Sequence, residues 1–488
     1  MPNRVFAIVL LAGAVVLGAG GLGGCGSPAT PGPATGRAAV TRPPDHVWRS
    51  VGYGWIVTLT GTGTGAEQRI YQTTAISCLP EEPLRQVAPP AEDGTLSFGP
   101  ARLPTLTLRP GPRGLAGPAS LRMLGSAADV DLEPLPALPA ACERPVPADP
   151  VHTFDVFWQT MAENYNSFAR RGVDWSAARD RYRPTINADT TPKQLFRALK
   201  KMISPLGDAH VYLEGPRDDS FAPKRPGTRD EDDVSRKRAV KAVNRYLAGL
   251  PDAPEIQDYA GGRIGWADLP GGVGYLRLTS FEEYGGADTP YLTSRDVLND
   301  VLNKLVTPAR VAALRQLVID VRFNTGGDDE LGLQLAGRLT NTPYVAYRKQ
   351  PRTNPTDPTE HGALRTVTVT PTAGVAHYTG PVTLLTSDLT VSAGETFVLA
   401  MLGRTPAPVR IGTATQGVFS DDMSRALPNG WSFTLGNEDY YDAGGHNWEG
   451  VGIPPDLTVP VFTSSELRDR RDSALAAALS GALPRPGS

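Results

Sequence analysis

The sequence predicts an α/β domain that follows a small helical bundle and, before the bundle, a small β domain. Three observations predict this order. Short apolar runs alternate with Gly and Pro turns over residues 43–148, apolar and aromatic residues recur every three or four positions over residues 149–215, and strand-like runs alternate with helix-like stretches over residues 261–465. A chain of 488 residues is long enough for two or three domains.

The composition is that of a folded protein with little net charge. Hydrophobic residues make up 40% of the chain and charged residues 20%, which is ordinary for a globular protein. The formal net charge of −3 provides no basic surface for nucleic acid. The composition therefore gives no reason to expect a nucleic-acid partner.

The first 25 residues have the pattern of a signal peptide. Arg4 gives a weakly positive start, an apolar run follows from Val5 to Leu17, and small residues lead to Cys25. The end of this segment resembles the lipobox of bacterial lipoproteins, so we expect Cys25 to be lipidated and to become the first residue. An uncleaved membrane anchor is the alternative, although the segment is rich in glycine and barely long enough to span a bilayer.

A flexible tether is expected over residues 26–42, which are rich in Pro, Gly, Ala and Thr. These predictions place the protein on the extracytoplasmic face of the bacterial cell envelope, with the lipid as its only membrane contact. Cys78 and Cys142 would then lie in an oxidising compartment and are expected to pair. Two unpaired buried thiols are the alternative, and neither cysteine has the Cys or His neighbours of a zinc site.

The elements of the first two units can be placed in order. Strands are expected at residues 54–59 and 104–108 of the β domain, where apolar residues alternate. In the bundle, the second helix follows the N-cap candidate Asp174, and the third follows Thr191 with Pro192 at its first position. The first helix has one apolar face, which we interpret as core and which consists of Phe154, Phe157, Trp158, Met161 and Tyr165.

A polar connection over residues 216–260 contains one expected helix, near residues 234–247. The alternation of strands and helices after it is typical of a largely parallel sheet. Residues 466–488 are expected to form a C-terminal helix and a tail. The expected strands of the α/β domain are residues 274–278, 317–321 and 381–386, and the expected helices are residues 294–305, 330–339 and 393–402.

Residues that could do chemistry follow two of these strands, at the strand ends where α/β enzymes keep their sites. Gly326 and Gly327 can turn backbone N–H groups toward a ligand, although a Gly pair is usually an ordinary turn. Ser392 begins the helix at 393–402, where the helix dipole favours a developing anion. Taken alone, Ser392 or Thr390 would more often merely cap that helix.

A third candidate, Glu449, precedes a Gly-rich turn, where an isolated Glu is normally solvated. A serine hydroxyl is a poor nucleophile, so it also needs a base. Two of the six histidines are suitably placed: His210 lies beside an acid after the third helix, and His446 lies in a Gly-rich loop before Glu449. The residue pattern alone does not separate these two histidines.

Six segments of the chain occur together in one order: residues 206–210, 274–278, 319–327, 386–395, 411–417 and 449–456. In this order they resemble the tail-specific, or C-terminal-processing, protease family, and the likeness covers residues 149–463. The likeness is strongest to the lysine-free branch of the family, which includes the core domains of tricorn protease and the repeats of interphotoreceptor retinoid-binding protein. The resemblance implies that the α/β domain is a ClpP/crotonase-like catalytic domain.

The resemblance also implies a role for each candidate. Ser392 would attack the scissile carbonyl, His210 would transfer the proton, and Glu449 would support the imidazole indirectly or position the serine. A further hydroxyl often links the Glu to the His in this family. No metal or cofactor is implied, and the partner would be a protein or peptide substrate.

The oxyanion would be bound by the backbone N–H of Ala393 and that of Gly327 or Gly326. Two departures from the family bear on the subtype. Val418 occupies the place of the lysine base of the Ser–Lys members, so the resemblance requires a histidine base. The interval between His210 and the strand at 274–278 is too short for a full PDZ domain with its linkers, which leaves open whether the substrate is selected by its C-terminus.

The sequence therefore predicts a serine-type peptidase of the cell envelope. A ligand-binding or scaffold lipoprotein that keeps the fold without the chemistry is the alternative, because the retinoid-binding repeats hold apolar ligands on the same fold. A lipid-tethered solute-binding protein is disfavoured, because the sequence lacks the two-lobed repeat organisation of that class. The remaining alternative is an enzyme with other acyl-transfer or esterase chemistry.

Overall fold

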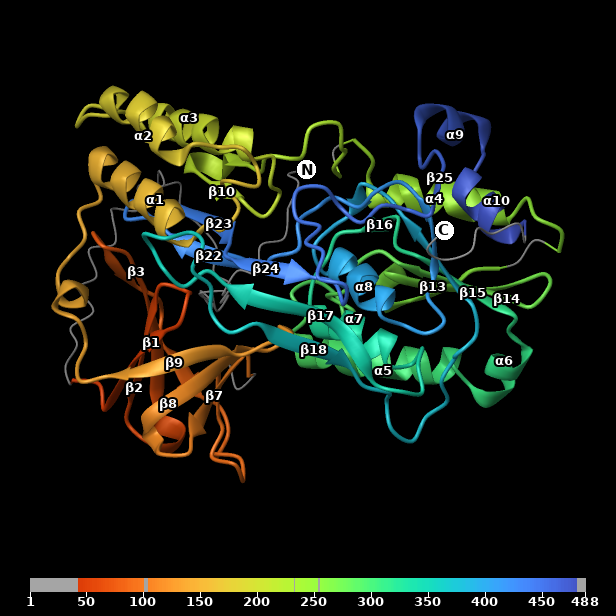
Figure 1. Cartoon of the computed structure of the whole chain (residues 1–488), viewed down its shortest axis with the longest axis horizontal. Coiled ribbons are helices and arrows are strands. Elements are labelled where there is room, and N and C mark those ends of the chain that lie inside the picture. Colours follow the sequence, from red (N-terminus) through yellow and green to blue (C-terminus); the bar gives the residue numbers. More distant parts are fainter. Residues whose placement is uncertain (1–42, 101–103, 232, 253–254, 481–488) are drawn as a thin grey trace, which may run out of the picture.

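The computed structural model describes residues 43–100, 104–231, 233–252 and 255–480. The expected signal peptide, the expected lipidation site Cys25 and the expected tether lie outside these residues. Two lobes are visible in Figure 1: the red and orange strands with the yellow helices form one, and green and blue elements form most of the other. Within the described ranges, no helix is long and apolar enough to cross a membrane.

A nine-stranded antiparallel sheet forms the N-terminal part, in the order β2-β1-β9-β8-β7-β6-β5-β3-β4. Because β2 also pairs with β3, the sheet closes into a barrel with β4 attached outside the ring. Closure pairs backbone groups that a free edge would expose. The strands are β1 (His46–Ser50), β2 (Trp55–Thr60), β3 (Glu67–Thr73), β4 (Cys78–Pro80), β5 (Leu84–Gln86), β6 (Leu96–Gly99), β7 (Leu106–Gly111), β8 (Gly114–Met123) and β9 (Val130–Leu135).

A disulfide joins Cys78 on β4 to Cys142 in the short 3-10 helix η2 (Ala140–Glu143), with the two Cα atoms 4.8 Å apart. The two cysteines are separated by 64 positions in the sequence. The bond fastens the segment that leaves the barrel to the outermost strand of the barrel.

Removal of this disulfide is expected to destabilise the N-terminal lobe. For a loop of 64 positions, the chain-entropy relation gives about 4 kcal/mol, which corresponds to a fall of about 10 °C in the unfolding midpoint of a domain of this size. Differential scanning calorimetry of the Cys78→Ala/Cys142→Ala variant would measure the change. The variant should respond equally in oxidising and reducing buffer, and a midpoint equal to that of the oxidised wild type would contradict the prediction.

Three helices follow the barrel, and their N-termini are capped by the side chains of Asp149, Asp174 and Thr191. Their apolar faces share one core with the barrel and with a strand from the C-terminal half. In this core the ring of Phe157 packs on that of Phe433, with centroids 4.8 Å apart. The β domain and the helices, expected as separate units, therefore have a common core. The helices are α1 (Pro150–Asn164), α2 (Trp175–Tyr182) and α3 (Pro192–Ile203).

The second lobe is built on a seven-stranded sheet in the order β12-β13-β14-β15-β19-β21-β25. Strands β14 to β25 are parallel to one another, and β12 and β13 add antiparallel strands at one edge. This is the largely parallel sheet that the strand and helix alternation predicts. The strands are β12 (Gln257–Tyr259), β13 (Ile264–Leu269), β14 (Val273–Leu278), β15 (Gln316–Asp320), β19 (Val382–Thr386), β21 (Val409–Gly412) and β25 (Leu457–Thr458).

Helices cover both faces of this sheet, because successive strand residues point to opposite faces. On β14, Leu276 packs with one group of helices and Tyr275 with the other. The first group is α5 (Tyr291–Leu305), α7 (Asp329–Ala336) and α8 (Ala393–Leu402), and the second is α4 (Arg236–Leu247) and α10 (Ser473–Leu479).

Three expected helices differ in extent, and the one expected at 294–305 begins at Tyr291. The helix expected at 330–339 ends at Ala336, where Gly337 forms its C-cap. The single C-terminal helix expected from residue 466 is two short ones, α9 (Ser464–Asp469) and α10, because Arg470 adopts a left-handed conformation with φ 55°. A short helix α6 (Pro308–Ala313), which the sequence reading did not include, precedes β15.

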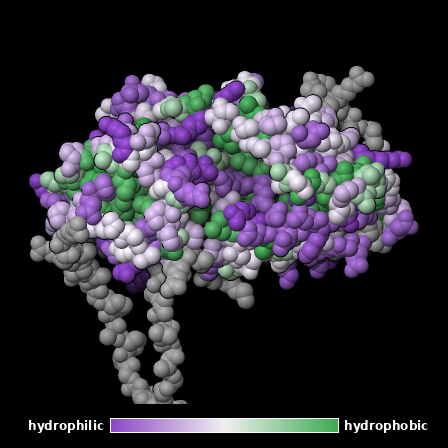
Figure 2. All heavy atoms as spheres, turned by 90° about the horizontal axis from the view of Figure 1, so that it is seen from below, coloured by the Kyte–Doolittle hydropathy of each residue, from purple (hydrophilic) through white to green (hydrophobic). Residues whose placement is uncertain are grey.

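Two smaller sheets connect the lobes. Residues 422–436, which belong by sequence to the expected α/β domain, lie in the first lobe because β23 pairs with β10. Seen from below, the surface is hollowed near its middle, and hydrophobic side chains are visible there and at the end formed by the N-terminal lobe (Figure 2). The sheets are β11-β10-β23-β22 and β18-β17-β24, made of β10 (Leu213–Glu214), β11 (Ser220–Phe221), β22 (Asp422–Ala426), β23 (Ser432–Gly436), β17 (Tyr344–Pro351), β18 (Arg365–Val369) and β24 (Glu438–Tyr441).

Candidate active site

Ser392 lies between the strand β20 (Leu389–Thr390) and helix α8, at the N-cap position of the helix. Its backbone has φ 55° and ψ −124°, a conformation that a non-glycine residue rarely adopts and that is found most often at functional sites. Its hydroxyl makes no capping hydrogen bond. The hydroxyl of Thr390 instead donates to the carbonyl of Val321 at 2.7 Å. Neither hydroxyl therefore caps the helix, although capping is the usual role of a serine or threonine at this position.

The Gly326–Gly327 turn lies directly against Ser392. Strand β16 (Phe323–Asn324) pairs with β20, which brings the two loops together. A Cβ atom on Gly326 would come 2.6 Å from the Cβ of Ser392, so this close approach requires glycine. The two backbones can therefore form one wall of a site.

The two glycines differ in the hydrogen bond of the backbone N–H. The N–H of Gly326 donates to Oδ1 of Asn324 at 3.0 Å. Among the described residues, no acceptor faces the N–H of Gly327 or that of Ala393, the first residue of α8. Of the groups predicted to bind an oxyanion, Gly327 and Ala393 have the free donors.

His210 lies in the loop that follows α3. The carboxylate of Asp208 accepts the backbone N–H of His210 at 2.9 Å, and the hydroxyl of Thr434 on β23 donates to the His210 carbonyl at 2.6 Å. The side chain is 9% exposed, and its Nδ1 has no partner within the described residues. No hydrogen bond joins His210 to Ser392 in the part of the chain that the structure describes. The loop thus fixes the backbone of His210 and leaves the imidazole unpaired.

The electrostatic surroundings of His210 are acidic. Burial lowers the pKa of the imidazole, but the carboxylates of Asp422, Asp208 and Glu449 outweigh that effect, and the pKa is raised above its ordinary value. Asp422, at the start of β22, has the largest charge effect. The sequence reading missed Asp422 because only the pairing of β22 in the first lobe brings it to His210.

Glu449 is 5% exposed, in contrast to the solvated side chain that its place in a turn indicates. One carboxylate oxygen accepts a hydrogen bond from Arg171, and the other accepts the backbone N–H of Phe419 at 2.9 Å. Burial and the charge of Asp208 raise the pKa of Glu449, and Arg171 opposes them. Both oxygens are thus occupied, and neither bonds to His210.

Arg171 connects the segments around these residues. Its guanidinium donates to the carbonyls of Gly207 at 2.9 Å and Gly417 at 3.2 Å as well as to Glu449. It therefore ties the loop that carries His210 to the loop that carries Glu449. Nothing in the sequence pattern marks Arg171, because its partners lie far away along the chain.

Glu395 lies one turn after Ser392 and is fully buried. It accepts the backbone N–H groups of Gly417 at 2.7 Å and Val418 at 2.8 Å, and burial raises its pKa to about 8. Val418, which stands where the Ser–Lys members have lysine, is itself buried. The segment around Val418 is thus held to helix α8 by the carboxyl group of Glu395.

The rival histidine lies elsewhere. The side chain of His446 is 71% exposed, and its Nδ1 lies 3.5 Å from the carboxylate of Asp442.

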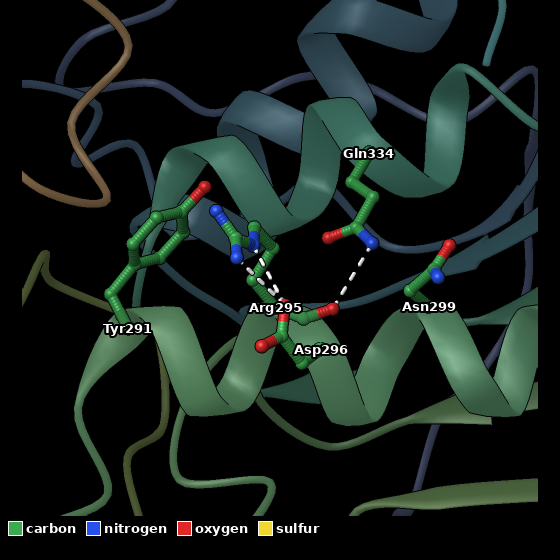
Figure 3. A pocket seen from close by; sticks show the side chains of 5 residues that line it. All are labelled: Tyr291, Arg295, Asp296, Asn299 and Gln334. Atoms are coloured by element: carbon green, nitrogen blue, oxygen red, sulfur yellow. Dashed lines mark hydrogen bonds and ion pairs between the residues drawn. The ribbon is translucent and has the colours of Figure 1, made fainter. Parts of the chain in front are cut away.

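A cavity of about 330 Å³ between α5 and α7, shown in Figure 3, contains none of the predicted site residues. Among the described residues, no group of His, Cys, Asp and Glu is arranged to hold a metal ion. The cavity is lined by Tyr291, Arg295, Asp296, Asn299 and Gln334.

Comparison with known families gives two matches along the chain. Residues 272–459 match peptidase family S41, and residues 147–204 match the tricorn protease C1 domain. The first match contains Ser392, the glycine turn and Glu449, and the second ends shortly before His210. These matches confirm the resemblance to the tail-specific proteases: residues 272–459 are a domain of peptidase family S41, a family of serine peptidases.

Solved structures are similar over about two thirds of the chain or more. A predicted peptidase from Parabacteroides merdae is 24% identical, with a TM-score of 0.56, over 68% of this chain and 96% of the other. Mature CPAF is 11% identical, with a TM-score of 0.48, over 66% and 94%. The tricorn protease is 14% identical, with a TM-score of 0.41, over 87% of this chain and 45% of the other. The first of these shows that the S41 peptidase fold is shared.

Proposed function

We propose that this protein is a serine peptidase that hydrolyses proteins or peptides in the cell envelope, with Ser392 as nucleophile and His210 as base. The observation that carries the proposal is the strained backbone of Ser392, which holds an uncapped hydroxyl at a helix N-terminus against the Gly326–Gly327 turn, inside an S41 domain. The catalytic domain would be of the ClpP/crotonase-like type.

The proposed reaction starts when His210 takes the proton of the Ser392 hydroxyl and Oγ attacks the scissile carbonyl. The developing oxyanion accepts hydrogen bonds from the N–H groups of Gly327 and Ala393. His210 then gives its proton to the leaving amine, and water hydrolyses the acyl-enzyme by the reverse sequence. The contact between Ser392 and His210 would tighten when substrate binds, as catalytic hydrogen bonds commonly do.

Glu449 would act on His210 through space and through Arg171. Its negative charge favours the imidazolium that forms during the reaction. The hydrogen bonds of Arg171 to Glu449 and to Gly207 support the position of the loop that carries His210. Glu449 is therefore proposed as a supporting residue that makes no direct bond to the base.

The proposed location is the outer face of the cytoplasmic membrane, reached by the lipid on Cys25. The disulfide between Cys78 and Cys142 supports an oxidising compartment, because such bonds persist outside the cytoplasm. The membrane would be contacted through the lipid alone. Labelling of the cells with a radioactive fatty acid, with Cys25→Ala as the control, would test the anchor.

The activity is tested by fluorophosphonate labelling of the full chain, with the adduct mapped by mass spectrometry. We expect one adduct, on Ser392, and cleavage of a mixed peptide library by the same sample. Heat-denatured protein is the control and should not label. A folded chain that neither labels nor cleaves would reject the proposal and favour the ligand-binding alternative.

The proposal also predicts the acid side of the pH profile. Only neutral imidazole accepts a proton, so kcat/KM should fall as the pH falls through the pKa of His210, which lies above its ordinary value of about 6.5. Asp422→Asn removes the largest charge effect and should move the midpoint to lower pH. Asp442→Asn, beside His446, is the matched control. An Asp422→Asn midpoint equal to that of the wild type would contradict this assignment.

A further inference from the structure

The loop between β8 and β9 (residues 124–127) reaches from the N-terminal barrel to the start of α7. The carbonyl of Gly125 accepts the backbone N–H of Glu330 at 3.0 Å. Arg122, near the end of β8, donates to the carboxylate of Glu330 at 3.0 Å. The barrel is therefore hydrogen-bonded to the first turn of the helix that directly follows the Gly326–Gly327 turn.

Gly125 also makes room for Asp328, the residue after Gly327. Gly125 is buried with φ +99°, and a Cβ atom on it would lie 2.1 Å from Oδ1 and 2.8 Å from Cγ of Asp328. The backbone N–H of Asp328 donates to the carbonyl of Phe281 at 2.8 Å. Asp328 is thus held from two sides, and a displaced Asp328 would carry the peptide unit of Gly327 with it.

The same loop touches the other side of the candidate site. The hydroxyl of Ser126 donates to the carboxylate of Asp421 at 3.0 Å, and Nζ of the buried Lys349 lies 2.9 Å from the same oxygen. Asp421 immediately precedes Asp422, the carboxylate with the largest charge effect on His210. One short loop of the barrel therefore contacts the segment behind the oxyanion donor and the segment beside the base.

We propose that residues 124–127 of the barrel are part of the support of the active site, with Gly125 and Ser126 as positioning residues. Gly125 sets the position of the Gly327 N–H through Glu330 and Asp328, and Ser126 holds the Asp421–Asp422 step. The barrel is then required for catalysis and is more than a spacer. This inference rests on the proposed peptidase function.

The test compares two glycine substitutions in the same barrel. Gly125→Ala introduces the Cβ atom that meets Asp328, whereas Gly114→Ala, at φ +64°, meets nothing within 4 Å and controls for the backbone penalty alone. We expect Gly125→Ala to lower kcat by about 10²-fold, the size of a lost oxyanion donor, with little change in KM. Affinity for a peptide boronate, whose tetrahedral adduct uses the same donor, should fall in parallel. Gly114→Ala should keep the wild-type values.

A second substitution separates positioning from general loosening of the fold. Asp328→Ala removes Oδ1 and Cγ, the two nearest atoms that a side chain at position 125 would meet, and leaves only the Cβ of residue 328, at 3.1 Å. Combined with Gly125→Ala, it should recover about tenfold or more of the lost kcat, since coupling is confined to residues in contact. If the Gly125 variant does not fold, Ser126→Ala takes its place. It should lower kcat about threefold or more with an altered pH midpoint, against Ser120→Ala on β8 as control, because it releases a hydrogen bond next to the charges around His210.

The outcomes separate the two proposals. A wild type that neither labels nor cleaves would reject the peptidase function. An active wild type in which Gly125→Ala behaves like Gly114→Ala, and Ser126→Ala like Ser120→Ala, would overturn the role of the barrel loop alone. Loss of kcat in Gly125→Ala without recovery in the Asp328 double variant would also overturn it, because the effect would then not pass through Asp328.

Discussion

Replacing Ser392 with alanine is expected to lower kcat by about 10⁴- to 10⁶-fold and to abolish fluorophosphonate labelling, because the nucleophile is lost. The fold should survive, since the hydroxyl makes no capping bond and alanine fits the space of serine. KM should change little, because the hydroxyl acts on the transition state. The measurements are single-turnover kinetics on a peptide substrate and the thermal unfolding midpoint of the same preparation.

Ser473→Ala is the matched control, because Ser473 also stands at the start of a helix, α10, on the far side of the sheet. It should retain wild-type kcat and labelling. Cleavage by the Ser392 variant at more than about one hundredth of the wild-type rate would place the nucleophile elsewhere, since residual catalysis without the nucleophile is far smaller than that.

Replacing His210 with alanine is expected to lower kcat by about 10²- to 10⁴-fold, the usual contribution of a general base. The remaining activity should also lose the acid limb of the pH profile, since the group that titrates is gone. That second readout distinguishes a base from a structural residue. The measurement is kcat/KM between pH 5 and 9 for the variant and the wild type.

His446→Ala tests the rival base directly. The His446 side chain is largely exposed and lies beside Asp442, so the variant should keep wild-type kcat and the wild-type pH midpoint. Full activity in the His210 variant, or loss of activity in the His446 variant, would move the base assignment from the first histidine to the second.

Local structure was predictable wherever its causes are local. The helix 393–402 begins and ends where the sequence predicts, and the helix 175–182 begins directly after Asp174, as predicted. In both cases the signal comes from neighbouring residues, namely a preceding cap or loop and a periodic apolar face. The helix expected at 330–339 ends early at Gly337, and the C-terminal helix is divided at Arg470. Element boundaries depend on single turns, which periodicity does not report.

Strand partners were not predictable. Residues 422–436 have the alternation of strands in the α/β domain, yet β23 pairs with β10 and packs in the core of the barrel and helices. A strand pattern specifies which side chains share a face but leaves the choice of a distant partner to tertiary packing. The common core of the barrel and the helices follows from that choice.

The sequence by itself determined the family, the order of the elements and the candidates Ser392, His210, Glu449 and the glycine turn, because each lies in a short ordered motif. Only the tertiary structure decided that the N–H of Gly326 donates to the side chain of Asn324, whereas the N–H of Gly327 does not. The structure likewise decided that Arg171 donates to Glu449, 278 positions further along the chain. Such contacts join residues far apart in the chain. Their energies depend on burial and distance, which exist only once the chain has folded.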